Sequence, residues 1–215
     1  MSETLIVALI SAGASLTVSM VTLITNTYIE KIKNKLEMWQ KRYQSKRERL
    51  SEIYRELIMI INLFPNLSPN DVLKWVEYPP NYSLEAFDAV IKILNYQIED
   101  YKKQLGSTNI EYERENHINM QILNREYCKK KISEIRDNYF NARDKYISFY
   151  KSDKALFDLY AGQNVRNALV EFEVVIHNTF ISGRNVGDAD DPLNNSIELC
   201  RRNLINSMRN DIGIS

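Results

Sequence analysis

Three arginines near the C-terminus are the side chains in this sequence best suited to bind a ligand. Arg184 lies in a loop between two glycines, and Arg201 and Arg202 are neighbours on the helix predicted to follow that loop. Guanidinium groups bind anionic oxygens well, and the backbone amides at the start of a helix favour the same ligands. We therefore predict a candidate site for an anionic ligand, including one of the nucleotide type, at these three arginines. The alternative interpretation is a basic turn that contacts only water.

Motifs that support catalysis, cofactor binding or metal binding do not occur in the sequence. The two histidines, His117 and His177, fall on different predicted helices and lack the spacing that places two metal ligands on one helix face. There is no glycine-rich phosphate-binding loop and no GxSxG sequence. The cluster of Asp188, Asp190 and Asp191 lacks the twelve-residue pattern of a calcium-binding loop, so we interpret it as a solvated turn. We assign no catalytic, cofactor-binding or metal-ligating residue and expect a protein that is not an enzyme.

The charges balance in total but not along the chain. The 215 residues include 28 Lys and Arg and 28 Asp and Glu. Residues 1–25 hold a single charge, at Glu3, whereas residues 26–50 hold eight basic and three acidic side chains, a net of +5. The remainder holds 20 basic and 24 acidic side chains, a net of −4. Because the basic run precedes a long acidic part, nucleic acid is not the expected partner.

The first predicted element is a membrane anchor over residues 4–25. These residues carry no charge and include ten Leu, Ile or Val, and as a helix they would span about 33 Å. A cleaved signal peptide is the alternative, but Met1, Ser2 and Glu3 carry no positive charge. The basic residues after the apolar run place the N-terminus outside and residues 26–215 in the cytoplasm. The sequence thus predicts a single-pass inner-membrane protein in contact with the lipid bilayer, with Cys128 and Cys200 as reduced thiols.

Small side chains share one face of the predicted anchor. Their spacing alternates between four and three residues, which keeps them together on a helix and lets two backbones approach closely. The face consists of Ala8, Ala12, Ser15, Ser19 and Thr22. We expect it to mediate self-association, so that the protein is a homo-oligomer. The alternative is that this face contacts lipid.

A long stalk helix is predicted over residues 26–64, because no glycine or proline interrupts it before Pro65. A stripe of apolar residues, which we call the seam, recurs along it at steps of three and four, with one interruption at Lys46. The seam consists of Ile29, Ile32, Leu36, Trp39, Tyr43, Leu50, Ile53, Leu57, Ile60 and Phe64. Such a seam needs a helical partner. The partner is either the same helix in another subunit or a later helix of this chain, and periodicity alone does not decide between them.

The remaining residues, 65–215, predict a cytosolic bundle of antiparallel helices. Ser68 and Pro69 start a short helix, and Ser83 is expected to cap a helix whose core stripe begins at Leu84 and ends at Leu105. A long helix ends near Tyr150 and carries Tyr139 and Tyr146 on its core stripe, which Gln121 and Arg125 interrupt. Another covers residues 153–180 with Leu156 in its core and a kink at Gly162. A last helix opens at Asp191–Pro192 with Leu193 in its core. No segment alternates like a strand, so the predicted fold class is all-α.

These features together predict a non-enzymatic adaptor or scaffold, anchored in the membrane, that acts by self-association and binding. The layout is also similar in architecture to membrane-anchored effectors of bacterial antiphage systems, including CRISPR-associated effectors that respond to cyclic oligonucleotides. This similarity lies in the order of anchor, stalk and bundle, and no motif carries it. It implies an alternative function, in which the bundle senses a signal and the transmembrane helices perturb the membrane.

Overall fold

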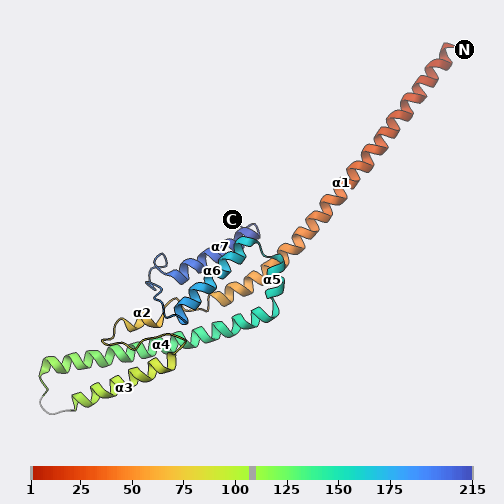
Figure 1. Ribbon diagram of the computed structural model, residues 1–215. Coiled ribbons are helices and arrows are strands. Elements are labelled where there is room, and N and C mark those ends of the chain that lie inside the picture. Colours follow the sequence, from red (N-terminus) through yellow and green to blue (C-terminus); the bar gives the residue numbers. More distant parts are fainter. Residues whose placement is uncertain (1, 107–109, 215) are drawn as a thin grey trace. The chain divides into compact units, whose positions relative to one another are not determined.

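A computed structural model describes residues 2–106 and 110–214, except for the side chains of residues 4–19. Within these ranges the regular elements are helices, so the all-α fold class is confirmed. The chain divides between Arg49 and Leu50 into two compact units. The helices are α1 (Glu3–Ile61), α2 (Pro69–Leu73), α3 (Phe87–Leu105), α4 (Tyr112–Ser152), α5 (Lys154–Tyr160), α6 (Gln163–Phe180) and α7 (Ser196–Asp211) (Figure 1).

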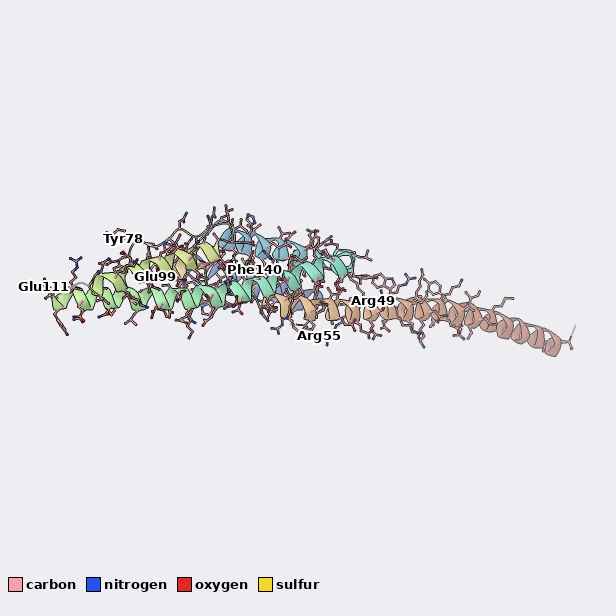
Figure 2. The ribbon with its side chains drawn as sticks, turned by 90° about the horizontal axis from the view of Figure 1, so that it is seen from below. Arg49, Arg55, Tyr78, Glu99, Glu111 and Phe140 are labelled. Carbon is pink, nitrogen blue, oxygen red and sulfur yellow. The ribbon has the colours of Figure 1, made fainter. Side chains whose placement is uncertain are left out.

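The first unit is a single helix, the part of α1 that ends at Arg49. Glycine and proline are missing between residues 14 and 64, so nothing in the sequence interrupts the helical hydrogen bonds. The hydroxyl of Thr25 donates to the carbonyl oxygen of Val21 at 2.7 Å, which satisfies a polar group within the helix itself. Every side chain described from Met20 to Arg49 is exposed, and in Figure 2 they stand out on both sides of the ribbon.

The predicted location in the inner membrane is contradicted by the described residues. No helix among them is long and apolar enough to cross a membrane. After Glu3, the side chains described in α1 begin with a short and mainly apolar run from Met20 to Ile24, and charged side chains recur from Glu30 to Arg49. The single-pass topology, with its outer N-terminus and cytoplasmic residues 26–215, is therefore corrected. The predicted contact with the lipid bilayer and the membrane-effector alternative stay predictions.

The second unit buries the C-terminal half of the seam inside the same chain. Leu57 and Ile61 are fully buried, and Phe64 contacts the rings of Tyr139 and Phe172 edge-on. This half of the seam is thus buried within the same chain, and Phe64 at its end packs against α4 and α6. The buried seam residues are Leu50, Ile53, Leu57, Ile60 and Phe64.

Two helix pairs complete the second unit, and the predicted helical bundle is confirmed. Figure 1 shows α3 beside the N-terminal part of α4, and α6 beside α7. Tyr139 on α4 joins the pairs, because its ring stacks on Phe180 of α6 at 4.4 Å and lies 5.8 Å from Phe87 of α3. Aromatic contacts of this kind add to the free energy gained by burial.

Several predicted helix boundaries are wrong. The helix expected to start after Ser83 starts at Phe87, and Leu84 is exposed rather than in the core. The last helix starts at Ser196 rather than at Pro192, because Asn195 is the residue whose side chain caps it, and Leu193 is exposed. The predicted helix over 153–180 is split into α5 and α6, and Leu156 is partly exposed where the neighbouring Phe157 is buried.

Polar residues that interrupt the core stripe of α4 are buried with their hydrogen bonds satisfied. Arg125 is 1% exposed, and its guanidinium donates to the side chains of Gln97 and Gln121 and to the carbonyl oxygen of Glu77. The same guanidinium lies 4.6 Å from the centre of the Tyr101 ring. A buried cation needs such partners to offset the loss of hydration. Through its hydrogen bond to Glu77, Arg125 also connects the segment between α2 and α3 to α4.

Candidate functional site

The structure does not join the three arginines of the predicted anion site through a common contact. Arg201 is buried, and its Nε and Nη2 donate to the carbonyl oxygens of Ile61 and Phe64 at 3.2 and 2.7 Å. Its Nη1 pairs with Glu198. Arg184 and Arg202 are exposed, and no hydrogen bond or ion pair in the described part of the chain links them to Arg201. Anion binding at Arg184 and Arg202 stays a prediction, whereas Arg201 holds the end of α1.

The helix N-terminus expected to assist that site is already capped. The Oδ1 atom of Asn195 accepts hydrogen bonds from the amides of Ile197 and Glu198, both at 3.1 Å. These amides would otherwise have been free to meet an anion. The sequence pointed instead to Asp191, whose Oδ1 accepts from the amide of Leu193 within a turn.

The predicted self-association face lies mostly outside the described side chains. Nothing is described of the side chains of Ala8, Ala12, Ser15 and Ser19, and Thr22 is exposed. Self-association through this face therefore stays a prediction.

The second unit has a cavity of about 300 Å³ between α4 and α6. Aromatic and aliphatic side chains make most of its wall. Three further side chains that line it, Arg143, Glu173 and His177, are charged or titratable. The apolar and aromatic residues of the wall are Phe64, Tyr139, Tyr146, Phe172, Ile176 and Ile181. Apolar walls with a few polar groups are typical of small-molecule sites.

Arg143 is held beside this cavity by a carboxylate from a strained segment. Glu85 has a positive φ of 56°, and its amide donates to the carbonyl oxygen of Phe180 at 3.2 Å. The Glu85 carboxylate then accepts from Nη1 of Arg143 at 3.0 Å and from the Tyr139 hydroxyl at 2.6 Å. This left-handed backbone costs free energy at a residue other than glycine. It places the Glu85 carboxylate within hydrogen-bond distance of two donors on α4.

Glu173 has a different environment from Glu85. The Tyr146 hydroxyl donates a hydrogen bond to it, and no cationic side chain in the described ranges forms an ion pair with it. Burial, followed by the hydrogen bond to Glu173, raises the pKa of Tyr146 well above its ordinary value. Tyr146 is therefore a neutral donor at physiological pH, and the charge of Glu173 is not cancelled by it.

Sequence reasoning placed Tyr139 and Tyr146 on the core stripe of α4 but missed the cavity. A buried phenol normally needs a hydrogen-bond partner, so two tyrosines one heptad apart were a signal for nearby acids. Local patterns do not indicate which acids these are, because Glu85 and Glu173 belong to segments outside α4.

The exposed half of the seam is the second candidate site, and it has a marked charge pattern. With 3.6 residues per turn, basic side chains flank this stripe on both sides, and Glu30, Glu37 and Glu48 fall on the opposite side of the helix. The exposed seam consists of Ile29, Ile32, Leu36, Trp39 and Tyr43. The flanking basic residues are Lys33, Lys35, Arg42, Arg47 and Arg49.

Among the described residues, no group of three His, Cys, Asp or Glu side chains is arranged to hold a metal ion. Comparisons of the chain with protein families, with curated proteins and with solved structures found no match.

Proposed function

We propose that this protein is a non-enzymatic helical adaptor whose α1 binds an acidic amphipathic helix of a partner protein. The observation that carries the proposal is the exposed seam of α1, flanked on both sides by basic residues. The second unit provides the folded body from which this helix is presented to the partner.

The exposed seam is apolar enough to serve as a docking surface. Trp39 is 73% exposed, and Leu36 and Tyr43 are more than half exposed. Large aromatic side chains contribute most to the free energy of binding at protein interfaces. The spacing of three and four residues fits the apolar face of a second helix, as in helix-in-groove recognition and coiled coils.

The charges beside the exposed seam favour a partner other than a second copy. In a two-stranded coiled coil, the residues that flank the apolar positions face those of the other helix. Two copies of α1 would bring Arg42 of one helix near Arg47 of the other, and like charges at such positions repel. A partner with Glu or Asp at its flanking positions would form ion pairs there. The homo-oligomer expected from the sequence is thus the competing outcome.

A designed peptide tests this proposal on the full-length protein. The probe is a fluorescently labelled helix of about three heptads, with Leu and Ile at the apolar positions and Glu at the flanking positions. We expect it to bind, with an affinity that falls as salt is added, and we expect Lys35→Glu to weaken binding about tenfold. Fluorescence anisotropy gives the dissociation constants.

Two controls distinguish binding of the peptide at the exposed seam from a general attraction between opposite charges. Lys41→Glu makes the same change of charge on the side of α1 away from the seam, so it should weaken binding much less than Lys35→Glu. A scrambled peptide of the same composition should not bind. The proposal fails if the peptide does not bind, if both variants act equally, or if sedimentation shows a homo-oligomer that Trp39→Glu dissociates.

A further inference from the structure

The cavity between α4 and α6 has an unbalanced charge. Arg143 is compensated, because Glu85 accepts from its Nη1 at 3.0 and 3.1 Å. Its guanidinium also lies 4.6 Å from the centre of the Phe140 ring, which does not line the cavity, and 5.9 Å from the centre of the Tyr139 ring, which does. Among the described residues, Glu173 accepts a hydrogen bond from the neutral hydroxyl of Tyr146 and forms no ion pair. The group in the wall that lacks an opposite charge is therefore a carboxylate.

The walls around this carboxylate favour the same kind of ligand. Phe64 and Phe172 meet edge-on with their ring centres 5.7 Å apart, and Tyr139 and Tyr146 add two more rings to the cavity wall. The faces of aromatic rings attract cations, and the attraction is stronger where water is excluded. Rings around a single acid provide both the apolar contact and the counter-charge that an organic ammonium ion needs.

We propose that the cavity lined by Phe64, Tyr146 and Glu173 binds a small organic amine, with the ammonium group on the Glu173 carboxylate and an apolar body between the aromatic side chains. This site goes beyond the proposed function, since α1 would bind its partner whether or not the cavity is filled. The volume of about 300 Å³ lies at the small end of ligand pockets, which suits a ring-bearing amine rather than a nucleotide.

Three probes of matched shape test the charge of the ligand. Tryptamine, tryptophol and indole-3-propionate share an indole ring and are a cation, a neutral alcohol and an anion at neutral pH. With the full-length protein, isothermal titration calorimetry should show that tryptamine binds at least about tenfold more tightly than tryptophol and that indole-3-propionate does not bind. Equal affinities, a preference for the anion, or no binding by any probe would overturn the proposal.

Variants of α6 then locate the ammonium group. Glu173→Gln should lower the affinity for tryptamine about tenfold, to the level of tryptophol, and leave the affinity for tryptophol unchanged. Glu171→Gln is the matched control, because Glu171 is an exposed acid of the same helix that does not line the cavity. If Glu173→Gln fails to fold, Ile176→Trp provides a second variant, since it should fill the cavity and abolish binding of tryptamine. Unchanged tryptamine binding in the folded variants would refute the site.

Discussion

Arg201 shows how a single buried residue can hold the end of a long helix. The last carbonyl groups of a helix have no partners within it. Arg201 of α7 donates to the carbonyl oxygens of Ile61, the last residue of α1, and of Phe64 just beyond it. Glu198 balances the charge of the guanidinium from one turn away. Arg201, which the sequence analysis predicted to bind an anionic ligand, thus uses its donors on groups of its own chain.

We predict that Arg201→Met destabilises the protein by about 3 kcal/mol, because two buried carbonyl groups and Glu198 lose their donor together. Arg202→Met is the control, since Arg202 is the exposed neighbour and such substitutions usually change stability by less than about 0.5 kcal/mol. Urea unfolding followed by circular dichroism measures both. Equal effects of the two substitutions would contradict the assigned role of Arg201.

At the scale of elements, the break between α5 and α6 depends on a close contact at Gly162. A Cβ atom at this position would lie 2.4 Å from Oδ1 of Asp211. The other oxygen of that carboxylate accepts from the Tyr54 hydroxyl at 2.6 Å and from the Gly162 amide at 3.1 Å. Asp211 therefore ties α1 and the start of α6 to the end of α7, and only glycine leaves room for it.

We predict that Gly162→Ala costs about 2 kcal/mol of stability, because it displaces a carboxylate that is held by two hydrogen bonds. Gly106→Ala should have almost no effect, since its Cβ would meet the nearest atom at an ordinary 3.4 Å. A double-mutant cycle tests the cause. Thermal unfolding is measured for Gly162→Ala, for Asp211→Ala and for the variant that carries both substitutions. If the glycine substitution costs as much without Asp211 as with it, the contact is not the cause.

The sequence predicts the helices better than their ends. Long segments with a clear apolar period were recognisable, including α1, α4 and α6. The starts of α3 and α7 were not, because contacts from elsewhere determine them. The amides of Leu84 and Glu85 donate to Ile181 and Phe180 at the end of α6, which forces a left-handed backbone where a helix was expected. The candidate cavity is assembled from distant segments in the same way, so local patterns do not reveal it.

At the scale of the whole molecule, buried phenols and a buried thiol make stability depend on pH. Burial raises the pKa of Cys128 from 9.0 to about 11. It likewise raises the pKa values of Tyr54, Tyr82, Tyr139 and Tyr146 above their ordinary value of 10.0. Each of these groups holds its proton in the folded protein at a pH where the unfolded chain has lost it. The unfolded state therefore binds fewer protons at high pH, and stability falls as the pH rises.

We predict that the free energy of unfolding declines above about pH 9, where the unfolded chain loses protons that the folded protein keeps. The Cys128 thiol has a lower ordinary pKa than the tyrosines, so it is the first of these groups to lose its proton in the unfolded chain as the pH rises. It should contribute a slope of up to about 1.4 kcal/mol per pH unit until the pH reaches its pKa in the folded protein. Cys128→Ala should lower stability at every pH but flatten the decline between about pH 9 and 10. Urea unfolding at several pH values gives the slopes, and identical slopes for both proteins would exclude the thiol as a source.

The two parts of α1 differ in how much of their surface is buried, so they should respond differently to heating. An isolated helix in water is only marginally stable, whereas one packed on a core melts with that core. Between Met20 and Arg49 no described side chain is buried, but from Leu50 onward the helix is part of the core. Heating should therefore fray α1 toward Arg49 long before its last turns unwind. A partner that docks on the exposed seam must also offset the entropy of keeping that stretch helical, so substitutions that favour helix there should tighten binding without touching the partner.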